Sequence, residues 1–262
     1  MYANYHTHSY HCHHAGGTPE DYVQAAIRRG MQIIGFSDHV PYPFSNGHCS
    51  GFRMDPQEHG IYVQELQELR ERYRDQIQIY IGYEAEYYPK EFPAMVENLN
   101  QYPWDYLILG QHFTHNEYDG VYSGSKKADE EEHLVQYVNQ IIEGLETGYF
   151  SCVTHPDLIR YRQDPQIYRR EMERLCRKAL SLQIPLEVNF LGLGEGRAYP
   201  YEPFWQIAGE MQAPVIFGCD AHRPEALLDE DTYQKACRLQ QKYGLNVQET
   251  FAFRHLGKGT TP

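Results

Sequence analysis

The chain alternates short apolar runs with longer stretches of helical periodicity along almost its whole length. The apolar runs are four to six residues long, and the segments between them are long enough for helices. This alternation is typical of repeated strand–helix units that build a parallel sheet. The sequence therefore predicts an α/β fold with seven strands, at Tyr2–Tyr5, Gln32–Phe36, Ile77–Gly82, Tyr106–Leu109, Phe150–Val153, Pro185–Val188 and Pro214–Gly218.

The segments between these runs carry helix start and stop signals. Thr18 is suited to cap a helix with Pro19 at its first position and acidic residues in its first turn, and Gly30 is suited to end it. Seven strands joined by helices fit a closed or nearly closed barrel, expected here as one domain over residues 1–262. The other predicted helices are Asp55–Asp75, Lys90–Gln101, Ala128–Thr147, Pro165–Gln183, Glu202–Gln212 and Glu230–Tyr243.

Composition narrows the range of functions. The net charge is −13 and no basic run exists, which argues against a nucleic-acid partner. No apolar run approaches the roughly 20 residues of a membrane helix, so no membrane partner is expected. Met1–Ser9 lacks the apolar segment of a signal peptide, and the six cysteines form no CxxC pair. We therefore expect a cytoplasmic protein with reduced thiols. The tail from about Gly257 is expected to be disordered, and the sequence leaves the oligomeric state open.

Histidine is unusually frequent, at 14 residues, and its placement follows the predicted strands. In α/β barrels the chemistry lies on the loops at the carboxyl ends of the strands. Six of the seven predicted strand ends are followed by a residue type that binds metals, and the sixth strand is followed by Asn189 and a Gly-rich loop ending at Arg197. The candidates are His6, His8, His14, Asp38, His39, Glu84, His112, His155, Asp220 and His222.

The spacing of these residues suits metal ligation. Alternate residues of a strand face the same side, so His6 and His8 can grip one ion, and Asp220 and His222 repeat the arrangement. Mixed nitrogen and oxygen ligands suit Zn²⁺, Fe²⁺ or Mn²⁺. Seven histidines and two carboxylates are too many for one ion but sufficient for three, if Glu84 bridges two of them. The alternative is a barrel that is rich in histidine by coincidence.

The motif series resembles that of the PHP (polymerase and histidinol phosphatase) family. The likeness runs from residue 6 to residue 222, nearly the whole chain. Within that family it is most similar to the histidinol-phosphate phosphatases, through the stretches at residues 12–15, 52–54, 82–87 and 111–113. The motifs are His6-x-His8, His14, Ser37-Asp38-His39, Gly82-Tyr83-Glu84, Gly110-Gln111-His112, His155-Pro156-Asp157 and Asp220-x-His222.

The resemblance implies a distorted seven-stranded (β/α)7 TIM-like barrel, the PHP fold, with three divalent ions (Zn, Fe or Mn). By this analogy the first ion is held by His6, His8, Glu84 and Asp220, the second by Glu84, His112 and His155, and the third by His14, His39 and His222. His14 is chosen for its spacing from His8. His13 remains the alternative ligand.

The resemblance also implies an activity, the hydrolysis of L-histidinol phosphate to L-histidinol and phosphate in histidine biosynthesis. A hydroxide bridging two of the ions would attack the phosphorus. Glu84, Asp220 and His222 would form the catalytic centre, and Arg160 and Arg197 would bind the phosphate of this small substrate. Asp38 is expected either to orient a ligand imidazole or to serve as a turn residue. The acid that protonates the leaving group is not identified.

Two long segments, residues 40–54 and 115–127, are candidate lids. His48 and Arg53 in the first are candidates for contact with substrate, and Glu117 and Asp119 in the second are candidates to receive a cationic amine. Another phosphoesterase of the same family, acting on nucleotides or phosphotyrosine, is one alternative function. A non-catalytic metal-binding barrel is the other, although it predicts a damaged site.

Overall fold

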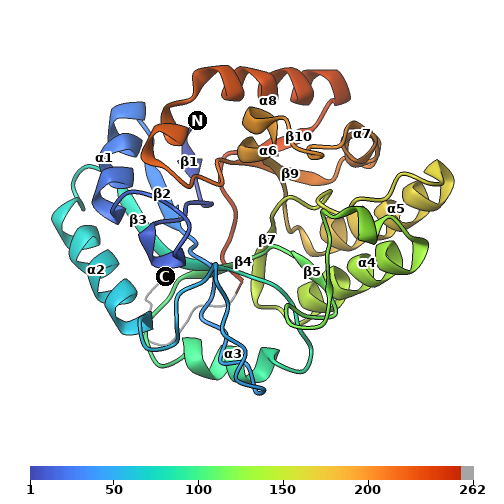
Figure 1. The fold of residues 1–262 in the computed structure, drawn as a ribbon. Helices are drawn as coiled ribbons and strands as arrows, with labels where there is room; N and C mark the ends of the chain where they lie inside the picture. The colour runs from blue at the N-terminus through green and yellow to red at the C-terminus, as the bar shows by residue number, and fades with distance from the viewer. Residues whose placement is uncertain (255–262) are drawn as a thin grey trace.

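The computed structural model describes residues 1–254 and shows a curled parallel sheet wrapped by helices (Figure 1). Eight strands follow the order β1-β2-β3-β4-β7-β8-β9-β10, and each neighbouring pair is parallel. The strands are β1 (Ala3–Asn4), β2 (Ile33–Phe36), β3 (Gln78–Ala85), β4 (Tyr106–Leu109), β7 (Phe150–Val153), β8 (Leu186–Asn189), β9 (Pro214–Gly218) and β10 (Asn246–Gln248).

All seven predicted strands are present, and the α/β barrel-like architecture is confirmed. The eighth, β10, was not predicted because it is only three residues long and contributes a single strongly apolar residue, Val247. The expected tail from about Gly257 lies outside the described residues.

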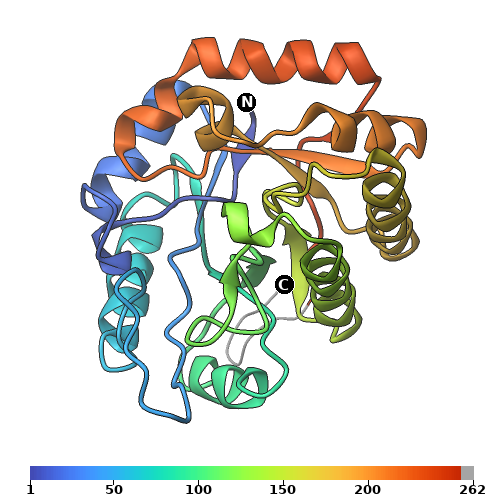
Figure 2. The same ribbon diagram turned by 45° about the vertical axis from the view of Figure 1, so that its right-hand side comes forward.

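Helices surround the sheet in both views (Figures 1 and 2). Thr18 caps α1 in a reciprocal pair with Asp21, and Gly30 ends it in the left-handed conformation, as the sequence predicted. The helices are α1 (Pro19–Arg29), α2 (His59–Arg72), α3 (Phe92–Leu99), α4 (Glu131–Glu146), α5 (Pro165–Leu182), α6 (Phe190–Glu195), α7 (Glu202–Glu210) and α8 (Glu230–Tyr243).

Two loops contain more structure than the sequence suggested. The Gly-rich stretch after β8 forms α6, because the Asn189 side chain accepts a hydrogen bond from the Gly192 amide and caps it. In the segment expected as a lid, β6 (Val121–Tyr122) pairs with β5 (Phe113–Thr114) as a small antiparallel hairpin. Within residues 1–254, no helix combines the length and the apolar character needed to cross a bilayer.

The barrel interior below the site is aromatic. Tyr5 and Tyr106 pack there beside short apolar side chains from β2, β4, β7 and β9. The chain after β10 passes through the middle of the barrel in Figure 1, and its Phe251 and Phe253 pack on this cluster. The Phe251 ring lies 4.3 Å from that of Tyr5, and the Phe253 ring stacks on Tyr106 at 5.1 Å. The interior is therefore packed with side chains, and the open space lies at the carboxyl ends of the strands.

Candidate metal centre

Backbone pairing at the barrel mouth brings the first and the ninth strands together. The His8 amide donates to the Ala221 carbonyl at 2.9 Å, and the Ala221 amide donates to the His6 carbonyl at 3.2 Å. A second bridge joins His39 to Glu84 across the ends of β2 and β3. The first pairing brings together candidate ligands that lie more than 200 residues apart in the sequence, and the second joins two that lie 45 apart.

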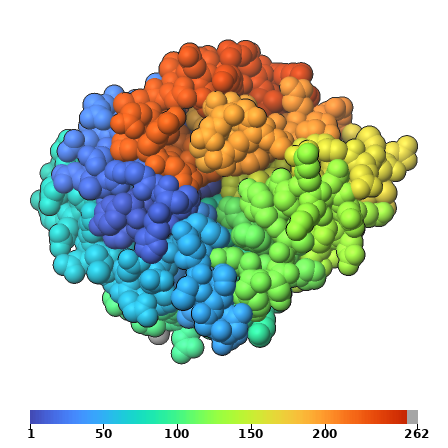
Figure 3. Space-filling model, in the orientation of Figure 1, coloured from blue at the N-terminus to red at the C-terminus, as the bar shows by residue number. Residues whose placement is uncertain are grey.

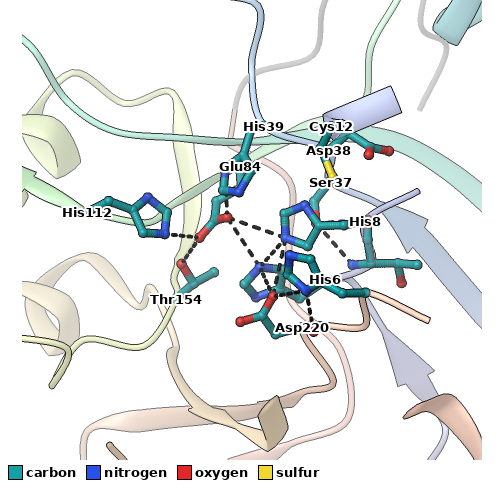
Figure 4. Close-up of polar contacts among 12 residues, drawn as sticks. His6, His8, Cys12, Ser37, Asp38, His39, Glu84, His112, Thr154 and Asp220 are labelled. Carbon is teal, nitrogen blue, oxygen red and sulfur yellow. Dashed lines mark hydrogen bonds and ion pairs between the residues drawn. The ribbon is translucent and has the colours of Figure 1, made fainter. Parts of the chain in front are cut away.

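Four side chains converge on one point at this mouth (Figure 4). Nε2 of His6 lies 3.1 Å from Nε2 of His8, and Oδ1 of Asp220 lies 3.3 Å from each of them. Oε2 of Glu84 lies 3.5 Å from both imidazole nitrogens. Around a tetrahedral ion with bonds of about 2.0–2.1 Å, ligand atoms stand about 3.3 Å apart. All four side chains are buried, and the structure thus brings the four residues predicted for the first ion together.

The other carboxylate oxygen of Glu84 faces a second group. Oε1 lies 2.8 Å from Nε2 of His155 and 3.6 Å from Nε2 of His112. The hydroxyl of Thr154 donates to the same oxygen at 2.9 Å. Glu84 is thus placed between the two sets of imidazoles, as a bridging carboxylate would be.

The third predicted group also comes together. Nε2 of His14 lies 2.9 Å from Nε2 of His222, and the His14 and His39 rings stack at 5.3 Å. Ligand atoms of His8, His39 and His222 lie within 4.8 Å of one another, so the third group adjoins the first. His13 instead pairs with Glu58 on the exposed surface, so the structure brings His14 rather than His13 to the cluster.

In several of these imidazoles, Nδ1, the nitrogen that points away from the cluster, forms a hydrogen bond with an oxygen. Nδ1 of His6 lies 2.7 Å from Glu187, and Nδ1 of His112 lies 2.8 Å from Glu86. A carboxylate behind an imidazole accepts a hydrogen bond from Nδ1–H, which leaves the Nε2 lone pair to face a metal. His14 and His222 make the equivalent contact to the backbone carbonyls of Cys12 and Asp220 respectively.

Neither Glu187 nor Glu86 was singled out from the sequence as a site residue. Glu187 is a charged residue inside the buried strand β8, two positions before Asn189 and so on the same face. Asn189 donates both to Glu187 at 2.9 Å and to Asp220 at 3.0 Å, which links the two carboxylates. A buried charge in a strand was the signal that could have found Glu187.

The charges of the cluster reinforce one another. Burial by itself would raise the pKa of Asp220, but His6, His8 and His222 hold that pKa well below its usual range. Burial would lower the pKa of His6, but the carboxylates of Asp220, Glu187 and Glu84 raise it well above its usual value. Because an imidazole ligand must be unprotonated, metal binding at His6 has to displace a proton.

Other imidazoles of the centre are already neutral. Burial lowers the pKa of His8 to about 3, and burial also lowers the pKa of His39 well below its ordinary value. Nδ1 of His39 lies 3.2 Å from Oε2 of Glu84 yet makes no hydrogen bond to it. Nδ1 of His39 is therefore a buried polar atom without a hydrogen-bond partner among the described residues, as the nitrogen of a metal-binding imidazole would be when no ion is present.

A cavity of about 450 Å³ opens above the cluster. In Figure 3 this face is hollowed where the blue N-terminal loop, the green segment and the orange segments meet. Arg197 lies on its wall, paired with Glu195, and its Nη1 donates to the Tyr199 hydroxyl at 3.1 Å. Arg160 is not among the residues that line this cavity.

Asp38 and the lid residue Glu117 are held by neighbouring side chains and backbone. Asp38 accepts hydrogen bonds from the amide and the hydroxyl of Ser9 at 2.7 and 2.9 Å, so it anchors the turn that follows His8. It comes within 4.8 Å of a ligand atom of His8 (Figure 4). Glu117, considered for a cationic amine, is instead held by Arg53 at 2.7 Å and by His48 at 3.1 Å.

Comparisons with known proteins identify relatives of this chain. The PHP domain family matches residues 4–190. A probable histidinol-phosphatase of Deinococcus radiodurans is 26% identical over 237 residues, covering 84% of this chain and 85% of that protein. The histidinol-phosphatase of Bacillus subtilis is 24% identical over 253 residues, 83% of this chain and 92% of that protein.

A solved structure shares the fold. It is a histidinol phosphate phosphatase from Lactococcus lactis, crystallised with zinc, L-histidinol and phosphate. The similarity has a TM-score of 0.74 over 98% of this chain and 99% of that chain, at 22% sequence identity.

Proposed function

The chain belongs to the PHP domain family, and from this premise we propose that it is a metal-dependent phosphomonoesterase that hydrolyses L-histidinol phosphate to L-histidinol and phosphate. The observation that carries the proposal is the cluster of imidazoles and carboxylates around Glu84, which lies at the floor of a cavity with Arg197 on its wall. The relatives named as histidinol-phosphatases support this choice of substrate.

The residues present fit divalent ions. The distances of 3.1–3.5 Å that join the Nε2 atoms of His6 and His8 to each other and to the carboxylates of Glu84 and Asp220 suit ligands of one ion of Zn²⁺ size. His112 and His155 would hold a second ion with the other oxygen of Glu84, and His14, His39 and His222 would hold a third. The proposed cofactor is therefore a set of three ions of Zn, Fe or Mn.

Divalent ions would supply positive charge for the phosphate and a water of lowered pKa as nucleophile. The chain's own residues would bind and orient the ester. Arg197 offers a guanidinium fork that suits phosphate oxygens, and Glu195 holds it at the cavity wall. Tyr199 accepts from Arg197, which leaves its own hydroxyl proton free to donate toward the cavity that it lines. Arg160 remains a proposed phosphate ligand.

Several wider properties accompany this proposal. We propose that residues 1–262 act as one barrel domain in the cytoplasm, on a small phosphorylated substrate and without a nucleic-acid or membrane partner.

Phe52 and Phe113 line the cavity above the metal centre, with their rings stacked at 6.3 Å. They offer an apolar surface for a flat ring carried by the leaving alcohol, such as the imidazole of histidinol.

The test is steady-state phosphate release from L-histidinol phosphate by protein loaded with Mn²⁺ or Zn²⁺. AMP and phosphotyrosine serve as controls, together with a chelated sample. We expect a kcat/KM above about 10⁴ M⁻¹s⁻¹ for histidinol phosphate, selective over both controls and abolished by chelation. Selective turnover of AMP or phosphotyrosine would replace the proposed substrate. No turnover of any ester by metal-loaded protein would favour a non-catalytic barrel.

A further inference from the structure

Arg53 stands out as a buried cation at the end of the long loop of residues 40–54. Its side chain is 2% exposed. Its Nη2 lies 3.1 Å from both oxygens of Glu86 and 2.7 Å from Oε2 of Glu117, while Nη1 donates to the Val40 carbonyl at 3.0 Å. One guanidinium therefore ties its own loop to the end of β3 and to the loop between β5 and β6.

Glu86 connects this guanidinium to the metal centre. It is fully buried, and its Oε1 lies 2.8 Å from Nδ1 of His112. The opposite nitrogen of His112, Nε2, faces Glu84. The chain of contacts from Arg53 through Glu86 to His112 thus ends on one of the proposed ligands of the second ion.

We propose that Arg53 is a positioning residue for the metal ligand His112, acting through Glu86 and held in place by Glu117 from the neighbouring loop. The inference deepens the proposed function, because it rests on the proposed metal centre, but it does not depend on which ester is hydrolysed.

The electrostatics explain why an arginine is needed. Glu86 and Glu117 are both buried carboxylates, and Glu84 is a third close by. A buried carboxylate without a cation is costly, so loss of Arg53 would leave Glu86 free to turn away from the imidazole. The planar guanidinium also fixes the orientation of a carboxylate, which a lysine ammonium does not.

The residue before Arg53 touches the same ligands from the cavity side. The Phe52 ring lies 5.1 Å from His39 and 6.4 Å from His112, and the Arg53 guanidinium lies 4.6 Å from the Phe52 ring. The position of this dipeptide is therefore coupled to two ligand imidazoles, and Arg53 is the residue that fixes the dipeptide to the barrel.

The experiment is a Mn²⁺ titration of the chelated full-length chain, with free Mn²⁺ counted by electron paramagnetic resonance. Arg53→Met should weaken one class of site by about 10- to 100-fold and leave the remaining equivalents bound, the range expected when a group behind a ligand is removed. Arg53→Lys keeps the buried charge and should show a smaller loss of the same class. It also keeps the test open if Arg53→Met does not fold.

Two comparisons separate positioning from simple destabilisation. Arg70→Met removes another arginine ion pair, that of Arg70 with Asp105, away from the cluster, and should leave every Mn²⁺ equivalent unchanged. In a Glu86→Gln background, Arg53→Met should add little further loss, because the link to His112 is already altered.

Wild-type Mn²⁺ affinity at every equivalent in folded Arg53→Met or Arg53→Lys would overturn the proposal. An equal loss of Mn²⁺ affinity in the Arg70→Met control would also overturn the proposal. If the wild-type protein binds Mn²⁺ but turns over no histidinol phosphate, the proposed substrate fails while this titration still decides the role of Arg53.

Discussion

At the level of single side chains, the imidazoles of the cluster differ in what lies behind them. His6 and His112 are backed by the carboxylates of Glu187 and Glu86, whereas Nδ1 of His8 and of His155 has no hydrogen-bond partner among the described residues. A carboxylate behind a ligand raises its basicity and fixes its tautomer. We therefore expect the metal affinity of the cluster to depend on acids that never touch an ion.

Glu187→Gln tests this dependence at His6. The amide keeps the shape of the side chain but removes the charge that faces Nδ1, so metal affinity should fall by about 10- to 100-fold. Isothermal titration of chelated protein with Zn²⁺ measures it. Glu171→Gln is the matched control, because Glu171 is equally buried but pairs with Arg170 and Arg174 on α5. Equal affinity in wild type and Glu187→Gln would contradict the prediction.

Arg197→Ala tests the phosphate clamp. The KM for the phosphate ester should rise at least about tenfold, because a charged hydrogen bond to the substrate is lost, while bound metal per chain stays constant. Steady-state kinetics and metal analysis of the same preparation check both statements. Arg160→Ala, assayed in parallel, tests the sequence prediction for an arginine that does not line the cavity. An unchanged KM in either variant rejects the role assigned to that arginine.

At the level of secondary-structure elements, the site is built where strands end and the adjoining segments meet. β3 supplies Glu84, and α2 packs on the outside of the same strand. His59 at the start of α2 lies 2.7 Å from the hydroxyl of Tyr83, the residue before Glu84. This buried contact joins a helix to the strand that carries Glu84.

The α2–β3 contact gives a pH prediction. Burial lowers the pKa of His59 to about 4, so between pH 4 and 6.5 the unfolded chain binds this proton more readily than the folded chain. The contribution of His59 to the free energy of unfolding is complete above about pH 6.5 and is lost as the pH falls toward 4. The free energy of unfolding therefore decreases by at most about 3 kcal/mol over this interval.

His59→Gln should flatten the pH dependence of stability in this interval. Urea unfolding of the metal-free wild type and variant across pH 4–7 measures the free energy of unfolding of each protein. The difference between the two free energies isolates His59, because the histidines that both proteins share contribute equally to each. Parallel profiles for the two proteins would show that His59 does not contribute.

At the level of the whole molecule, the barrel is closed at its mouth by the same residues that gather the ligands. The pairing of His6 and His8 with Ala221 joins the two sides of the sheet, and Phe251 fills the interior beneath them. Four buried carboxylates, those of Glu84, Glu86, Glu187 and Asp220, cluster at this junction. Cations bound there would join distant strands and offset this charge, so metal and global stability should be linked.

Removing the metal should therefore lower the melting temperature. A ligand present at about a thousand times its Kd stabilises the folded state by about 4 kcal/mol, which for a chain of this size corresponds to roughly 10 °C. Calorimetry of chelated protein, before and after Zn²⁺ is restored, checks the shift and its reversal. Identical melting temperatures in both states would argue against ions at the strand junction.

The sequence by itself determined which side chains reach the mouth. The spacings of His6-x-His8 and Asp220-x-His222, and the positions of Glu84 and His155 near predicted strand ends, are local properties of the chain. The structure departs from the expected strand repeat at Asp220, which follows the end of β9 and has a left-handed φ of 47°. Repeated strand–helix units place all such ends at one edge, so the barrel and most of the candidate ligands could be predicted without long-range information.

Only the tertiary structure decided what stands behind those ligands. Glu187 reaches His6 across 181 residues, and Arg53 meets Glu117 across 64. It also decided that His14 rather than His13 reaches His222, and that Phe251 lies inside the barrel. No local pattern encodes such pairings, because they depend on how separate loops pack over the barrel once it has closed. Strand periodicity sets the direction of a side chain, whereas the identity of its neighbour is set by the packing of the whole chain.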